Sequence, residues 1–271
     1  MRRMLALTAF VSLLSPAAWA QQVPFTELYT TQVVVTGSDE RNRPLGFRLC
    51  FNDVLVKASG DGSIVGDNRF AAFEAKAGEY IDSFGYRDKL LGKPLRDEQG
   101  SYDRPHFLTC HFIPHKVDEI LTSMGRKPWP NPRPVLAMVL VVHGRKASGV
   151  LSSDGVFDPD MRESLATTAR RYGIIVNLPS VAALKDSGVD PGRAAAIPAD
   201  RLSKLAAASN GTLTLAGNLQ WSDAAYAWTA SWSLKAGGRH FKWAVRGVNY
   251  DEAFRVGVRG AGRVLSGNGK P

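Results

Sequence analysis

The spacing of apolar residues predicts a first group of helices and strands before residue 127. Residues 27–37 alternate with period two, which predicts a strand with Thr31, Val33 and Val35 on one face. We expect a helix over 68–80, strands over 81–91 and 105–113, and a helix over 114–124. Between the first strand and these elements, a stripe at helical spacing predicts a helix over 43–59, and its members are Phe47, Cys50, Phe51, Val54 and Ala58.

Four prolines lie within residues 128–134, and this segment predicts a linker. Proline has a fixed φ and no backbone N–H, so such a run excludes a regular helix or strand. We therefore place a boundary here, between a domain over 21–127 and a domain over 135–265.

The pattern after the linker predicts a second group of elements. Residues 135–142 are continuously apolar, as in a strand buried on both faces. A helix is expected over 158–172, with Asp158 as its N-cap and Gly173 as its C-cap. The remaining expected elements are a strand over 174–176, a helix over 199–208, three strands over 212–221, 226–235 and 239–248, a helix over 251–265, and a disordered tail over 266–271.

The two groups together predict the fold class. Each group combines a few strands with helices that carry one apolar stripe, and such elements are stable only when helices cover a sheet. The prediction is an α+β or α/β protein of two small sandwich-like domains, each a mostly antiparallel or mixed sheet flanked by helices.

Aromatic residues mark one face of the three consecutive strands. Trp228 and Trp232 alternate with polar residues, and Trp221 and Trp243 repeat the pattern on the neighbouring strands. Such a face either stacks on sugars in a glycan-binding site or packs against helices as one side of a core. Agreement among three strands favours the core.

The N-terminus has the pattern of a cleavable signal peptide over residues 1–20. Two arginines precede an apolar run, and Ala18 and Ala20 stand where signal peptidase requires small residues before a new N-terminus at Gln21. The run is shorter than the roughly 20 residues that span a bilayer. The sequence predicts export to the periplasm and release in soluble form.

Several short segments resemble an uncharacterised bacterial family. They are Tyr29-Thr30-Thr31, residues 39–44, residues 50–60, residues 97–100 and Pro128-Trp129. In these segments the chain resembles the domain of unknown function 2066 (DUF2066). The resemblance implies an exported envelope protein and transfers no catalytic residue.

Cys50 and Cys110 are the two cysteines of the chain. Both fall at expected inward-facing positions, one on the helix over 43–59 and one on the strand over 105–113. Either a disulfide or two separate buried thiols fits this pattern.

The chain carries no recognised catalytic motif, cofactor loop or zinc spacing, so we expect no catalytic, cofactor-binding or metal-binding residue. The net charge of +9 suits an anionic surface, but an exported chain without a nucleic-acid motif is not expected to bind nucleic acid. Arg255, Arg259 and Arg263 recur every four residues on the last helix. They form either an interaction face for an acidic partner or an anionic membrane, or a solvated helix face.

These observations lead to two functional hypotheses. The leading one is a non-enzymatic periplasmic module for envelope assembly or protein interaction, with an unidentified envelope protein as its partner. The alternative is a periplasmic protein that binds a small ligand or a glycan.

Overall fold

The computed structural model describes residues 25–92 and 104–271 of the chain. The expected signal peptide, with Ala18, Ala20 and Gln21, lies outside the described residues. Within them, no helix combines the length and the apolar character that crossing a membrane requires.

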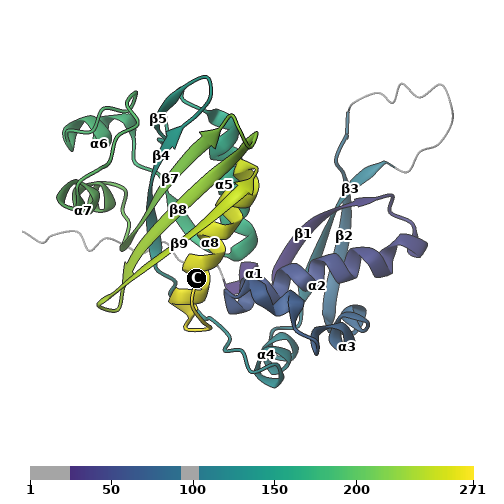
Figure 1. Ribbon diagram of the computed structural model, residues 1–271. Helices are drawn as coiled ribbons and strands as arrows, with labels where there is room; N and C mark the ends of the chain where they lie inside the picture. The colour runs from purple at the N-terminus through teal and green to yellow at the C-terminus, as the bar shows by residue number, and fades with distance from the viewer. Residues whose placement is uncertain (1–24, 93–103) are drawn as a thin grey trace, which may run out of the picture.

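The N-terminal half is a three-stranded antiparallel sheet with α2 (Arg43–Ser59) across one face (Figure 1). The strands lie in the order β1 (Thr30–Thr36), β3 (Pro105–Phe112), β2 (Ile81–Asp88). α2 has the predicted bounds and ends at Gly60, which takes the left-handed conformation of a C-cap. The short helices are α1 (Phe25–Leu28), α3 (Phe70–Glu74), α4 (Pro114–Ser123) and the 3-10 helices η1 (Glu40–Asn42), η2 (Gly62–Gly66) and η3 (Ala77–Tyr80).

The C-terminal half is a six-stranded mixed sheet. Its order is β5 (Ser148–Val150), β4 (Val135–His143), β7 (Leu213–Ser222), β8 (Ala227–Ala236), β9 (Arg239–Val248), and β6 (Ile175–Asn177) pairs with the start of β4. α5 (Pro159–Tyr172) and α8 (Tyr250–Ser266) lie on one face, whereas α6 (Val181–Asp186) and α7 (Ala199–Ala208) cover the β4 side of the other (Figure 1). The predicted fold class is confirmed by the two helix-covered sheets.

β4 is buried on both faces, as its continuous apolar run predicts. Met138 and Leu140 point into a core that continues through both halves and includes Phe51 of α2 and Phe254 of α8. The alternate side chains of β4 belong to a smaller cluster under α6 and α7, formed by Val139, Val141, Val150, Leu184, Val189 and Leu205.

The aromatic face of β7, β8 and β9 packs beneath α8. Trp232 is 2% exposed, and Gly257 of α8 passes so close that a Cβ there would lie 2.6 Å from the indole ring. The Nε1 of Trp243 donates to the carbonyl of Val256 in the same helix at 3.1 Å. α8 thus occupies the central part of the face that a stacked sugar would need.

Two predicted elements of the N-terminal half need correction. The strand expected over 27–37 begins only at Thr30, because a helical turn carries Leu28 into the core between the halves. The helix expected over 68–80 is broken into α3 and η3. Phe70 and Tyr80 both pack on the ring of Phe51, and one straight helix would hold them about 15 Å apart.

Other differences are smaller. β2 ends at Asp88 instead of reaching residue 91, because the Asp88 carboxylate accepts from the Leu90 N–H and turns the chain. β5 and α6 were not predicted, since three and six residues are too few to repeat the apolar pattern of a strand or a helix. Residues 266–271, expected to be a disordered tail, lie against the junction between the halves, where Asn268 makes hydrogen bonds.

The structure joins Cys50 and Cys110 in a disulfide between α2 and β3, with their Cα atoms 6.3 Å apart. Both residues are fully buried. Cys110 lies on the face of β3 that also carries Leu108 and Phe112, and Cys50 lies on the side of α2 that packs on this face. The bond therefore fixes the helix to the central strand of the sheet.

The double substitution Cys50→Ala and Cys110→Ala is expected to lower the free energy of unfolding by about 4 kcal/mol, because the bond closes a loop over a separation of 60 residues. Urea unfolding of the two proteins measures the difference. Wild-type protein unfolded with a thiol reductant should behave like the variant, and identical midpoints with and without reductant would contradict the prediction.

Candidate functional site

Arg133 lies at the point where the two halves meet. Its side chain is 1% exposed and no carboxylate pairs with it among the described contacts. The guanidinium donates to the carbonyls of Lys57 and Gly173, each at 2.9 Å, and twice to that of Trp129. Lys57 is in the last turn of α2 and Gly173 caps α5, so one cation serves the negative ends of two helix dipoles. Burial lowers the pKa of Arg133 to about 10.

Two glycines make room for this arrangement. Gly60 and Gly173 cap α2 and α5 in the left-handed conformation. A Cβ at Gly60 would lie 2.6 Å from the ring of Trp129, and one at Gly173 would lie 2.6 Å from Arg133 Nη1. The ring of Trp129 in turn stacks under the guanidinium, with 4.3 Å between the ring centroid and Arg133 Cζ. The backbone N–H of Trp129 donates to the Ala58 carbonyl. The proline segment 128–134 therefore packs between the halves.

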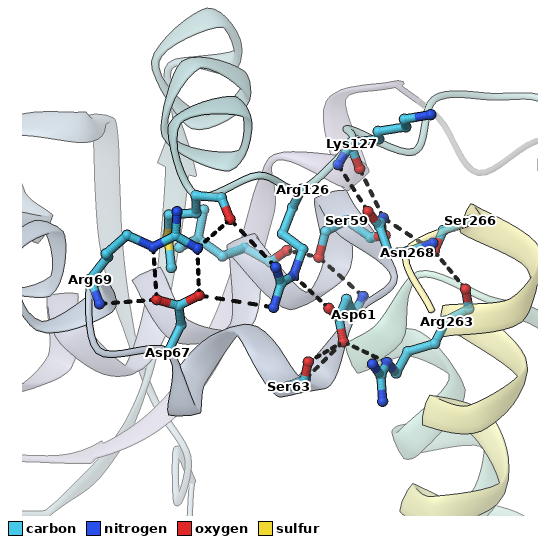
Figure 2. Close-up of polar contacts among 12 residues, drawn as sticks. Ser59, Asp61, Ser63, Asp67, Arg69, Arg126, Lys127, Arg263, Ser266 and Asn268 are labelled. Atoms are coloured by element: carbon cyan, nitrogen blue, oxygen red, sulfur yellow. Dashed lines mark hydrogen bonds and ion pairs between the residues drawn. The ribbon is translucent and has the colours of Figure 1, made fainter. Parts of the chain in front are cut away.

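A second contact between the halves is centred on Asp61, which is completely buried (Figure 2). Its Oδ2 accepts from Arg126 Nε at 2.8 Å, and its Oδ1 lies 3.0 Å from the Nε of Arg263 in α8. Ser63 donates to the same Oδ1 through its N–H at 3.0 Å and its hydroxyl at 2.7 Å. One buried carboxylate is thus shared by two arginines from distant parts of the chain.

The polar network continues to both sides of Asp61 (Figure 2). On one side Asp67 binds Arg69, whose hydrogen bonds hold the pKa of the Asp67 carboxyl well below its usual range. On the other side the Asn268 amide donates to the carbonyls of Ser59 and Lys127 and accepts the Lys127 N–H. The C-terminus is thereby tied to the end of α2.

A third contact pairs Asp53 of α2 with Arg171 of α5, at 2.6 Å. Burial raises the pKa of Asp53, and the nearby Arg171 partly offsets that effect. Beside this pair, burial lowers the pKa of Lys57, whose ammonium donates to the carbonyls of Glu27 and Thr30. The Asp53–Arg171 pair joins the two halves and therefore limits movement of one half against the other.

Two of the three arginines in the row on α8, Arg259 and Arg263, face this junction. Arg263 pairs with Asp61, and Arg259 lies beside Gly62, where a Cβ would stand 2.6 Å from its Cδ. Arg255 pairs with Glu252 of the same helix at 2.6 Å. Arg259 and Arg263 of the candidate interaction face therefore contact the N-terminal half of the same molecule. The periodicity of one helix cannot reveal such a contact.

A polar cleft of about 390 Å³ lies where α5 and α8 begin. The Ser164 hydroxyl donates to the Asp251 carboxylate across it. No His, Cys or Lys is among the residues that line it in the described part of the chain, and the group that accepts from Ser164 is the Asp251 carboxylate. The lining residues are Asp160, Glu163, Ser164, Thr167, Thr168, Asn249, Asp251 and Arg255.

A second cleft, of about 420 Å³, lies in the N-terminal half beside α2. Phe47 lines it and packs edge-on against Phe84, with 4.9 Å between ring centroids. Charged side chains of both signs, Arg43, Arg48, Glu40 and Glu74, surround this apolar floor. Over the described residues, no group of three or more His, Cys, Asp or Glu side chains could hold a metal ion.

A further open feature is the outer face of β7, β8 and β9, away from α8. Apart from Ala244 and the imidazole of His240, the side chains on this face are hydroxyls, amides and cations, and the described strands place no carboxylate on it. We call it the basic face, and its residues are Asn218, Gln220, Thr229, Ser231, Ser233, Lys235, His240, Lys242, Ala244 and Arg246.

Comparison with known families matches residues 21–130 to a domain of unknown function (DUF8605). The resemblance to DUF2066 is therefore wrong, and the family that does match carries no assigned activity to transfer. The match ends inside the proline segment 128–134, close to the predicted domain boundary. No curated protein matches the chain.

Sequence reasoning did not find Arg133, Asp61 or the basic face. Pro132-Arg133-Pro134 reads as an exposed linker, and Asp61 reads as part of a Gly-Asp-Gly turn. The available signal for the basic face was the polar half of the same alternation that marked the aromatic face, with Lys235, Lys242 and Arg246 in it.

Asp61→Asn is expected to lower the free energy of unfolding by about 3 kcal/mol, because two largely buried guanidiniums lose their shared counter-charge. Chemical unfolding measures the effect. Asp39→Asn is the control, since the Asp39–Arg41 pair is 59% and 71% exposed and should contribute less than about 1 kcal/mol. Equal losses in the two variants would refute the role given to Asp61.

Arg133→Met is expected to cost about 3 kcal/mol or more, because the carbonyls of Lys57, Trp129 and Gly173 lose their donor while buried. Thermal unfolding compares this variant with Arg145→Met, which removes a side chain that is 62% exposed. A melting temperature of the Arg133 variant no lower than that of the control would contradict the prediction.

Proposed function

We propose that the protein is exported to the periplasm and acts there as a non-enzymatic module for envelope assembly or protein interaction. The signal-peptide pattern over residues 1–20 supports export. The observation that carries the interaction role is the basic face, which extends roughly 30 Å along the strands and has no described helix packed on its β8 and β9 part.

The construction beneath this face supports the same role. Trp232 and Leu234 of β8 alternate with basic-face residues and are fixed in the core under α8. The surface is therefore rigid before any partner arrives, and rigid surfaces lose less entropy on binding. Arg133 and Asp61 keep the N-terminal half in a fixed position relative to it.

The clefts give less support to an enzymatic role. In the cleft between α5 and α8, three carboxylates and one paired arginine surround Ser164, and its hydroxyl is already engaged by Asp251. For the glycan hypothesis, α8 covers Trp232 and holds Trp243, which leaves the half-buried Trp221 and Trp228 as candidate stacking rings. These two rings already pack against each other, with 5.5 Å between their centroids.

Site-specific photo-cross-linking in intact cells tests the proposal. A photoreactive residue in place of Lys242 is expected to form a reproducible adduct with one envelope protein, recovered from the periplasmic or membrane fraction. Lys185 on α6 is the matched control, because it is exposed on the opposite end of the domain and should give no such adduct.

The other outcomes decide between the alternatives. Absence of a reproducible protein adduct from position 242, or adducts with lipid or glycan alone, would overturn a protein-interaction role for this face. A chain that remains in the cytoplasm would overturn the export that the role requires.

A further inference from the structure

β9 is an edge strand with an unpaired side. It pairs with β8 along its whole length, from Arg239 to Val248, and no other described strand pairs with it. Figure 1 shows it at the end of the sheet, with α8 behind its inner face. From residue 239 to 246 the backbone is extended, and alternate residues present their N–H and C=O groups to the outside, whereas Gly247, with a φ of 73°, forms a bulge near the end of the strand.

Cationic side chains lie along this edge. Lys242 and Arg246 of β9 point to the basic face together with the imidazole of His240, and Lys235 of β8 lies opposite His240. Arg239 adds a further cation at the hairpin end, stacked on the ring of Phe241 at 4.9 Å. No carboxylate of the described strands neutralises them on this face.

Cations on an edge strand also protect a protein from pairing with itself. Here two copies that met edge to edge would place Lys242 and Arg246 against cations of the other copy. The same charges attract a strand of opposite sign, so they reject a second copy while they admit an acidic segment. Protection and selection are therefore compatible in this strand.

The edge is held in the geometry that strand addition needs. Trp243 and Val245 alternate with the basic residues and pack against the core under α8. The bond from Trp243 Nε1 to the Val256 carbonyl further fixes the strand to that helix. A partner strand would thus meet a preorganised edge over residues 239–246, before the bulge at Gly247, and add its own main-chain bonds.

We propose that β9 takes up an extended acidic segment of a protein partner as an additional strand, with Lys242 and Arg246 selecting its charge. This inference rests on the proposed interaction role and names its contact surface. An anionic membrane fits less well, because the basic face offers only Ala244 as an apolar contact and leaves the edge backbone unpaired.

The mature protein is titrated with a synthetic peptide of about ten residues that alternates Glu and Thr, and amide NMR shifts are followed. Shifts are expected to concentrate in residues 239–248. Lys242→Glu with Arg246→Glu should weaken binding at least about tenfold. Lys185→Glu with Lys204→Glu, an equal charge change on α6 and α7, should change it less than about twofold.

Two further probes separate strand pairing from simple charge attraction. The same Glu–Thr peptide with every backbone N–H replaced by N–CH3 has the same charge but no main-chain donor, and it should bind at least about tenfold more weakly. Equal binding of the two peptides, or no binding of the Glu–Thr peptide, would overturn the inference. So would binding to phosphatidylglycerol vesicles that needs Lys242 and Arg246 while the peptide does not bind.

Failure here is distinguishable from failure of the proposed function. A protein adduct at position 242 without peptide binding would leave the interaction role in place and refute strand addition. If the Glu–Thr peptide binds at residues 239–248 and needs Lys242 and Arg246, but no protein adduct forms in cells, strand addition at β9 would be supported and the envelope role refuted.

Discussion

The position of Arg133 is the constraint on which the arrangement of the two halves depends. A cation this deeply buried is stable only when its donors are satisfied, and here main-chain carbonyls at the ends of α2 and α5 accept them. The ends of both helices must then converge on one point, which explains the glycines that cap them. The hydrophobic core follows the same geometry and continues from one sheet to the other.

The charges around Asp61 act in the same direction. Removing one carboxylate from water is costly unless cations and hydroxyls replace the lost hydration, and Arg126, Arg263 and Ser63 do so from three segments. Arg263 belongs to the row that sequence alone offered as an outward-facing surface. Because Arg263 is paired within the molecule, it is not available to a partner. The cations of the opposite face of the sheet have no carboxylate of the described strands beside them.

The functional argument depends on what the helices leave uncovered. α8 covers the aromatic side of β7, β8 and β9, and α7 reaches only β4 and β7 on the other side. The outer side of β8 and β9 therefore remains open, and β9 has an unpaired edge. A polar, basic and rigid surface of this kind supports the proposed recognition of an acidic partner.

The sequence by itself determined most helices and strands, because apolar periodicity and capping residues are local. The bounds of α2, α7 and β9 agree with it, as does the burial of β4 on both faces. Only the tertiary structure decided where Phe70, Leu28 and Arg263 lie, and that the proline segment is packed between the halves. Those positions depend on contacts between residues far apart in the chain, such as Phe51 with Tyr80 and Asp61 with Arg263, and no local pattern encodes such contacts.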